Sequence, residues 1–407
     1  MDRRLDARRT PAVVVGAQGN GLGVARSLAS AGVPTTVVGD NLRDPAMWSR
    51  RCKSHLVERS YGRPLVDGLL KLRDTMPARP VLILTDELAV NTVSEHRAEI
   101  GACYRLRLPS PTMVDTLGDK ELFHRFAEAH ALPVPRSIIV QRESDLAQIG
   151  QLGSPVIIKP ADKFLVHMGR IERLRVAETI DDAAATCRRY LSLDETPVVQ
   201  EWIDGPDSNI YFALFHCGLS PASRSIFFGR KIAASPPRVG STAVCVPAPE
   251  AAAALRPVTE KFLDASRYEG LGSLEFKWNP RDGRFVIIEP TVGRTDSQEE
   301  IAALNGLNLP LAAYCYELGL PVPEQKHVDA VAWRESLRSI PIRSGLRSRT
   351  YDGYWRIDDP MPAFVYCVDL AIRAGRRLMR RPGPATLPRR RHRATGPRLR
   401  IRGRSSS

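Results

Sequence analysis

Two acidic residues in the stretch "LEFKWNPRDGRFVIIEPTVGR" could hold a cation between them. The segment "NPRDG" is rich in turn-forming residues and separates two apolar runs, which predicts a β-hairpin. If its register places Glu275 opposite Glu289, both carboxylates share one face and repel each other unless a cation neutralises them. Mg²⁺ binds one or two carboxylates together with phosphate oxygens and would suit such a pair. An isolated pair of this kind is more typical of ordinary exposed residues of a hairpin. Glu289 directly follows the apolar "FVII", which weakens that interpretation.

Lysines at three places could meet phosphate groups. Lys159 ends the apolar strand "PVIIKP", where an ammonium is unfavourable unless it meets an anion or extends to the surface. This segment alone does not distinguish contact with an anion from extension to the surface. Lys120, in "LGDKELFHRF", belongs to the first turn of a predicted helix, and Lys277 lies on the same strand face as Glu275.

The stretch "TPVVQEWIDGPDSN" could bind a nucleoside. An apolar strand reaches Glu201, Trp202 and Ile203 before a Gly-Pro turn. Backbone groups at such a strand end can pair with the edge of adenine, and Asp207 could accept hydrogen bonds from ribose hydroxyls. The alternative is a strand and a turn with no ligand.

In this order, the segments around Lys120, Lys159, "VVQEWIDGPD" and "LEFK…IIEPTVGR" resemble the ATP-grasp superfamily over about residues 12–320. The resemblance is greatest to its carboxylate–amine ligase branch, relatives of D-aspartate ligase and of the carbamoyl-phosphate synthetase and biotin carboxylase folds. It implies that ATP activates a carboxylate as an acyl phosphate, which an amine then attacks to give an amide, ADP and phosphate. Such catalysis rests on positioning and charge neutralisation rather than on a protein nucleophile.

The resemblance also implies a role for each matching residue. ATP phosphates would be held by Lys120 and Lys159, adenine by Glu201, Trp202 and Ile203, and ribose by Asp207. Mg²⁺ or Mn²⁺ would be held by Glu275, Glu289 and Thr291, and the transferring phosphoryl group would be stabilised by Arg294 and Lys277.

Two departures from the superfamily pattern concern the same site. Thr291 stands where the metal motif usually has asparagine, so a weaker neutral oxygen replaces the amide. The loop after Lys159, "ADKFLVHMGR", offers only Gly169 where the superfamily is glycine-rich. Lys163, His167 and Arg170 are candidate replacements for the missing backbone contacts to phosphate.

The expected fold class is α/β plus α+β. Strands and helices alternate over residues 1–110, which predicts a Rossmann-like domain with a parallel sheet; the resemblance makes it the pre-ATP-grasp domain. Short turns between strands predict antiparallel sheets in the two ATP-grasp lobes that follow. The lobes are expected at 111–200 and 201–320. A C-terminal extension with an amphipathic helix is expected at 321–381, and a basic disordered tail at 382–407.

A glycine-rich turn in "VVVGAQGNGLGVARSLASAGV" raises the alternative of a nicotinamide-dependent oxidoreductase, with Asp40 at the end of the second strand. The G-x-G-x-x-G/A spacing fails, because Gly19 and Gly21 lead to Val24. We therefore expect Gly19, Gly21 and Gly23 to form the floor of the part of the site that binds the acceptor substrate, and to hold a substrate carboxylate there.

Asp86 and Glu87 follow the strand "VLILT", at the edge where open α/β sheets bind ligands, and could receive an amino group. The alternative for Asp86 is a helix N-cap. The flexible segment "PPRVGSTAVC" could line the substrate pocket with Arg238 and Ser241.

The spacing of the cysteines and the lengths of the apolar runs limit the classes of protein to which this sequence is expected to belong. Seven scattered cysteines without a CxxC pair fit neither a disulfide framework nor a zinc site. No signal sequence or apolar run near 18 residues is evident, so we expect a cytoplasmic enzyme.

Nearly all of the net charge of +14 comes from thirteen arginines in residues 373–407, a segment without lysine or acidic residues. The rest of the chain is almost neutral. One interpretation of these arginines is a solvated, disordered tail. A second is that they attract anionic lipid at the inner face of the membrane. Nucleic-acid binding is a third, which the absence of aromatic residues in this segment disfavours. The remaining alternatives are a biotin-carboxylase-like enzyme and a non-catalytic basic adaptor.

Overall fold

A parallel four-stranded sheet begins the computed structural model, which describes residues 10–161, 166, 169–322, 324–335 and 349–379. Its order is β3-β2-β1-β4. The strands are β1 (Ala12–Val15), β2 (Thr35–Gly39), β3 (Lys53–Leu56) and β4 (Val81–Leu84). This confirms the parallel sheet predicted from the alternation of strands and helices over residues 1–110.

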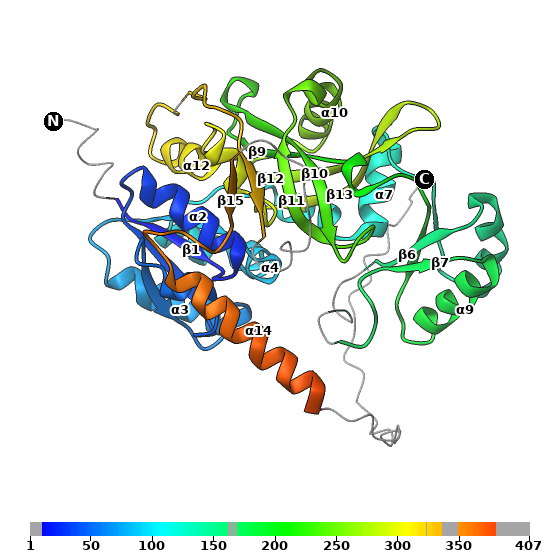
Figure 1. Ribbon diagram of the computed structural model, residues 1–407, viewed down its shortest axis with the longest axis horizontal. Helices are drawn as coiled ribbons and strands as arrows, with labels where there is room; N and C mark the ends of the chain where they lie inside the picture. The colour runs from blue at the N-terminus through cyan, green and yellow to red at the C-terminus, as the bar shows by residue number, and fades with distance from the viewer. Residues whose placement is uncertain (1–9, 162–165, 167–168, 323, 336–348, 380–407) are drawn as a thin grey trace, which may run out of the picture. The chain divides into compact units, whose positions relative to one another are not determined.

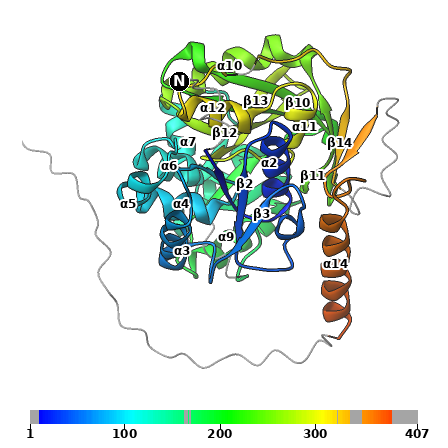
Figure 2. The same cartoon turned by 90° about the vertical axis from the view of Figure 1, so that its left-hand side faces the viewer.

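Helices cover both faces of this sheet, because successive strand residues point to opposite sides. Val14 packs in one core cluster with α2 (Gly19–Ser30), whereas Val13 and Val15 pack in another with α3 (Gly62–Asp74) and α4 (Glu87–Glu95). Figure 2 shows α2 on one side of β2 and β3, and α3 with α5 (Arg97–Cys103) on the other. The short 3-10 helix η1 (Pro45–Trp48) follows β2.

An antiparallel sheet of four strands, in the order β5-β8-β6-β7, carries Lys159 and Glu201. It contains β5 (Ser137–Ile139), β6 (Val156–Pro160), β7 (Arg175–Ala177) and β8 (Pro197–Glu201). The 3-10 helix η2 (Glu143–Leu152) and α9 (Ile180–Leu191) share its apolar core (Figure 1). Two helices precede it in the chain, α6 (Pro111–Gly118) and α7 (Lys120–Ala129).

A seven-stranded sheet in the order β13-β12-β9-β10-β11-β14-β15 forms the largest layer. Its strands are β9 (Ile210–Cys217), β10 (Ser225–Ser235), β11 (Ser241–Pro247), β12 (Gly270–Asn279), β13 (Arg284–Val292), β14 (Ala332–Arg334) and β15 (Thr350–Asp352). Three short 3-10 helices lie in its connections, η3 (Asp207–Asn209), η4 (Pro221–Ser223) and η5 (Pro249–Ala251). Helix α10 (Ala252–Ala265) packs in one core cluster with this sheet, and α11 (Glu300–Leu304) and α12 (Leu309–Glu317) pack in another. The predicted hairpin is therefore present as β12 and β13.

The chain separates into two units, Met1–Val368 and Asp369–Ser407, and α14 (Met361–Met379) begins in the first. The predicted tail at 382–407 lies outside the described residues. Within the described residues, no helix is both long enough and apolar enough to cross a membrane.

The glycine-rich turn brings backbone and side chains too close for larger residues. A Cβ at Gly21 would lie 1.8 Å from the carbonyl oxygen of Gly16, and one at Gly19 would lie 2.9 Å from the Tyr354 hydroxyl. At Gly23 the neighbours are the buried side chains of Glu299 and Glu300. These glycines therefore allow α2 to pack closely against Gly16 at the end of β1, against Tyr354, and against the start of α11.

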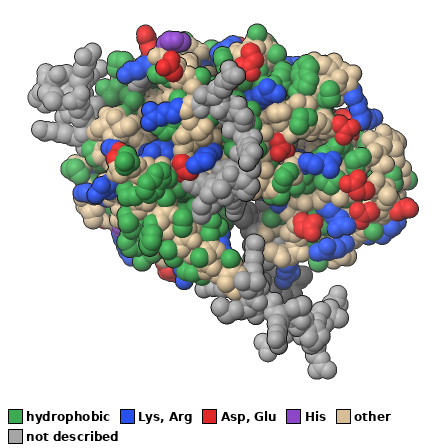
Figure 3. Space-filling view, viewed as in Figure 1, with side chains coloured by type: hydrophobic (Ala, Val, Ile, Leu, Met, Phe, Trp, Pro, Cys, Tyr) green, Lys and Arg blue, Asp and Glu red, His purple; other side chains and the backbone are tan. Residues whose placement is uncertain are grey.

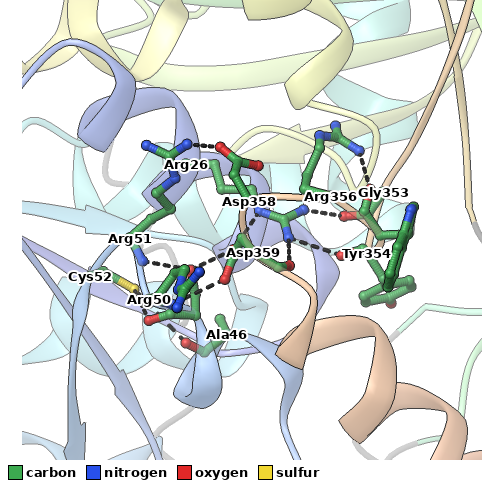
Figure 4. Close-up of polar contacts among 12 residues, drawn as sticks. Arg26, Ala46, Arg50, Arg51, Cys52, Gly353, Tyr354, Arg356, Asp358 and Asp359 are labelled. Carbon is green, nitrogen blue, oxygen red and sulfur yellow. Dashed lines mark hydrogen bonds and ion pairs between the residues drawn. The ribbon is translucent and has the colours of Figure 1, made fainter.

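Buried Arg26 on α2 holds the segment of residues 350–359, which we call the strap. Its Nε lies 3.0 Å from Asp359 Oδ2, and its Nη atoms donate to the carbonyl oxygens of Gly353 and Tyr354 (Figure 4). Asp359, 1% exposed, also accepts from Ser49 Oγ at 2.7 Å and from the backbone N–H of Arg50. This buried ion pair fixes the strap to the N-terminal sheet.

We predict that Asp359→Ala lowers the free energy of unfolding by about 3 kcal/mol or more, because it leaves the Arg26 guanidinium buried without its anion. The neighbouring Asp358→Ala is the control, since Asp358 and its partner Arg51 are half exposed and such pairs contribute about 1 kcal/mol or less. Urea unfolding followed by tryptophan fluorescence measures both. Equal effects of the two substitutions would contradict the assigned role of Asp359.

We also predict that Glu299→Gln stabilises the protein increasingly as pH rises. Glu299 is fully buried, and among the described residues neither carboxyl oxygen has a hydrogen-bond partner; this burial raises its pKa to about 8. The folded state keeps a proton that the unfolded state releases, so wild-type stability falls as pH rises from about 5 to about 8. The gap between Glu299→Gln and wild type should widen by about 1.4 kcal/mol per pH unit over that range. Urea titrations at several pH values test this against exposed Glu250→Gln, and a constant gap would contradict it.

Candidate active site

A cavity of about 450 Å³ collects side chains from both antiparallel sheets and from α4 and α7. Its volume is in the range of small-molecule sites. Its wall carries more basic than acidic side chains. The basic residues are Lys120, Lys159, Arg173, Lys231, Arg238, Lys277 and Arg294, and the acidic ones are Glu87, Glu201, Glu275, Glu289 and Asp296. Such a wall favours an anionic ligand.

Glu275 and Glu289 face each other across β12 and β13, in the register proposed from the sequence. Each has a cationic partner. The buried Lys231 Nζ lies 2.6 Å from Glu275 Oε1, and Arg173 Nη2 lies 3.3 Å from Glu289 Oε2. Lys231 is only 3% exposed, so its ammonium depends on this carboxylate. Both glutamates line the cavity, together with Thr291.

These residues fit a magnesium ion that arrives with a nucleotide. The described residues contain no group of three or more histidine, cysteine or acidic side chains placed to hold a metal. Two carboxylates and a hydroxyl form an incomplete protein shell, and Mg²⁺ typically completes such a shell with phosphate oxygens and water. Glu275, Glu289 and Thr291 are therefore the candidate ligands.

The three lysines predicted to meet phosphate all line the cavity. Lys159 is 8% exposed, and its Nζ lies 3.5 Å from the carbonyl oxygen of Ile288 on β13. The backbone N–H of Lys120 donates to Ala161, which joins the start of α7 to the end of β6. Lys277 Nζ donates to Gly205 and Pro206, and burial lowers its pKa. Three elements thus direct ammonium groups to one cavity.

Glu201, Trp202 and Ile203 line the cavity at the end of β8. The Glu201 carboxylate accepts from the backbone N–H and the Nε of Arg136, at 2.9 Å each. Trp202 Nε1 donates to Asp204, and the Arg238 guanidinium lies 4.6 Å from the Trp202 ring centroid. Arg238 and Ser241 line the cavity, as expected.

Asp207 does not line the cavity, in contrast to its predicted role with ribose. Its carboxylate accepts from the backbone N–H groups of Ala234 and Arg238, at 2.9 and 2.8 Å. Asp207 therefore organises the turn between β10 and β11.

Glu87 and Arg294 line another part of the cavity wall, with Asp296 and Ser297. Arg294 Nη2 lies 3.9 Å from Glu87 Oε2. Asp86 is the N-cap of α4 and accepts from the backbone N–H groups of Leu88 and Ala89, which confirms the N-cap alternative.

Gly19, Gly21 and Gly23 also lie outside the cavity wall. Tyr354, Gly16 and the buried glutamates occupy the space beside them. The glycines at this turn therefore have a packing role, and the substrate carboxylate stays a prediction.

The cavity wall also contains residues that the sequence analysis missed, among them Arg173, Lys231, Asp296 and Ser297. Lys231 carried a usable signal, since "IFFGRKIAA" places an ammonium within an apolar strand, as "PVIIKP" does for Lys159. The other three lie in connections, and only the fold brings them to the cavity. Lys163 and His167 lie outside the described residues, and Gly169 and Arg170 do not line the cavity.

Comparison with known proteins gives two curated relatives, while no protein-family model matches. The chain is 23% identical over 238 residues to D-aspartate ligase of Enterococcus faecium, an alignment of 56% of each protein. It is 30% identical over 115 residues to D-alanine–D-alanine ligase of Chromohalobacter salexigens, covering 27% of this chain and 35% of the relative. The chain thus aligns with about half or less of each relative's length.

Among solved structures, the chain is similar to N5-carboxyaminoimidazole ribonucleotide synthetase in its ADP complex. The TM-score is 0.61 and the identity 13%, with 80% of this chain and 81% of the other covered. At this identity the likeness establishes a shared fold.

Proposed function

This chain is an ATP-grasp protein, and on that premise we propose that it couples a carboxylate to an amine at the expense of ATP. One observation carries the proposal. Glu275 and Glu289 lie opposite each other in a cavity that Lys120, Lys159 and Lys277 also reach. Paired carboxylates that accept a divalent cation, beside several ammonium groups, form a site suited to a metal-bound triphosphate.

We assign the nucleotide to the wall between the two antiparallel sheets. Lys120 and Lys159 would bind its phosphates, and the end of β8 at Glu201, Trp202 and Ile203 would hold its base. Bound Mg²⁺ would neutralise phosphate charge from its position at Glu275, Glu289 and Thr291. Asp207 is left out of this set, because its carboxylate is taken by backbone N–H groups.

The proposed reaction has two steps. A carboxylate oxygen of the substrate attacks the γ-phosphorus of ATP, so ADP leaves and an acyl phosphate forms. An amine nitrogen then attacks the acyl carbon, the C–O bond breaks, and inorganic phosphate leaves as the amide forms. Arg294 and Lys277 stabilise the charge on the transferring phosphoryl group. Preorganised cations of this kind are the main source of catalysis in phosphoryl transfer.

Glu87 and Asp296 suit the amine substrate. Both are acidic cavity residues, and Arg294 lies beside Glu87. Acidic side chains attract an ammonium group, whereas Arg294 can hold a carboxylate. The names of the two curated relatives refer to amino acids, which supports an amino acid as one of the two substrates.

The domain layout belongs to the same proposal. Residues 1–110 would serve as the pre-ATP-grasp domain, 111–200 as the small lobe and 201–320 as the large lobe. Residues 321–381 would form the C-terminal extension, in which β14 adds to the sheet of the proposed large lobe by pairing with β11.

We predict that the protein releases phosphate from Mg-ATP only when both a carboxylate and an amine are supplied, and that hydroxylamine traps the acyl phosphate as a hydroxamate. A screen of amino acids and other carboxylates, paired with amines, measures phosphate release and hydroxamate formation. Lys159→Met and Glu289→Gln should each lower turnover at least about a hundredfold, because the first removes a cation at the phosphates and the second removes a charged ligand of the metal.

Matched controls are Lys71→Met, an exposed lysine on α3, and Asp282→Asn in the turn of the β12–β13 hairpin. Both should keep wild-type turnover. Full activity of Lys159→Met or Glu289→Gln would overturn the site assignment. Turnover that requires bicarbonate and yields no hydroxamate with other carboxylates would favour the carboxylase alternative instead.

A further inference from the structure

An exposed apolar face begins in the strap and continues along the first turns of α14. It consists of Trp355, Ile357, Met361, Phe364 and Val368, whose exposed fractions are 54, 90, 41, 62 and 41%. Large apolar side chains occur singly on most protein surfaces, whereas these five lie within 14 residues of the chain. Such features mark surfaces that meet an apolar partner.

The helix places three of these side chains on one side. Met361, Phe364 and Val368 follow the i, i+3, i+7 spacing of a single helix face. Ala363 is 9% exposed, so another side of α14 supplies the contact with the protein. Surface helices normally bury their apolar stripe against the core, whereas this helix also presents one outward.

The exposure is fixed by buried contacts. The strap is held by Arg26 and Asp359, and the backbone N–H of Trp355 donates to Asp352 Oδ1 at 2.9 Å. The Tyr354 and Tyr366 rings stack at 3.9 Å between centroids, which joins the strap to α14. The apolar face is therefore supported from beneath by ordered side chains.

The acidic residues nearest to this face in the sequence are paired with arginines. Three acidic residues occur in 353–372, and each pairs with an arginine: Asp358 with Arg51, Asp359 with Arg26, and Asp369 with Arg373. Only five positions beyond Val368 the arginine-rich sequence begins, with thirteen arginines and no acidic residue to position 407. The first of these arginines is Arg373. Because five residues span at most about 18 Å, its Cα lies within that distance of the Val368 Cα.

We infer that the apolar face binds an anionic lipid surface, with the following arginines attracted to its headgroups. Peripheral proteins reach stable membrane binding by combining apolar insertion with basic charge, and tryptophan is favoured at the interface. The proposal goes beyond the ligase function and does not depend on it.

Charge distinguishes a membrane from a second copy of the chain. A symmetric dimer through this face would place the same patch against itself, so the starts of two arginine-rich sequences would approach each other. Elsewhere, Lys and Arg side chains are interspersed with Asp and Glu on the face drawn in Figure 3. The sequence before residue 373 is almost neutral, so the net positive charge of the chain lies in the sequence after the apolar face.

We test this with the full chain and vesicles of phosphatidylcholine containing about one third phosphatidylglycerol, compared with phosphatidylcholine alone. Wild type should sediment with the anionic vesicles at low salt and be released at high salt. Ile357→Asp/Phe364→Asp should weaken binding at least about tenfold, because charged side chains replace the inserted ones. Replacing Arg389, Arg390, Arg391 and Arg393 with glutamine should weaken it about a hundredfold or more, since each basic residue strengthens binding roughly fivefold.

Leu219→Asp is the matched control, because Leu219 is 71% exposed but lies between β9 and β10. It should bind as wild type does. Unchanged binding by Ile357→Asp/Phe364→Asp, or no binding by wild type, would overturn the inference. The inference would also be overturned if Ile357→Asp/Phe364→Asp converted a wild-type dimer to a monomer. Tight binding of RNA that lipid does not displace would overturn it as well.

Discussion

Two carboxylates on neighbouring strands, directed to one cavity, are the constraint on which the rest of the site depends. Glu275 and Glu289 are directly opposite each other on β12 and β13. Like charges in such positions destabilise a sheet unless cations compensate them. Lys231 and Arg173 supply that compensation within the protein. The same excess of cations that makes the pair tolerable also makes the cavity attractive to phosphate.

The cations come from different layers, so the site exists only when the layers pack together. Lys159 ends β6 in the small antiparallel sheet, and its Nζ reaches the backbone of β13 in the large one. Lys120 starts α7 and is joined to β6 through Ala161. A charge-neutralising site built this way couples ligand binding to the placement of the two sheets, as expected where catalysis rests on positioning.

The sequence analysis succeeded where local chemistry and strand periodicity coincide. The hairpin register followed from a turn-rich segment between apolar runs, and Lys159 from an ammonium that ends an apolar strand. It did not foresee the contacts that Asp207 and the glycine turn make within the protein, since neither residue type reveals whether a ligand or the protein itself satisfies it. Backbone N–H groups bind Asp207, and Gly16, Tyr354 and Glu299 fill the space around the turn. Arg173 and Asp296 lie in connections whose placement is set by tertiary packing alone.

The central claim is that Glu275 and Glu289 bind the metal of a metal–nucleotide complex, and nucleotide affinity tests it without knowledge of the substrates. Calorimetric titration of ADP, with and without Mg²⁺, compares wild type with Glu275→Gln, Glu289→Gln and the double variant. The account predicts that Mg²⁺ raises the affinity of the wild type for ADP and that this gain disappears in the double variant. A gain from Mg²⁺ that survives in the double variant would contradict it.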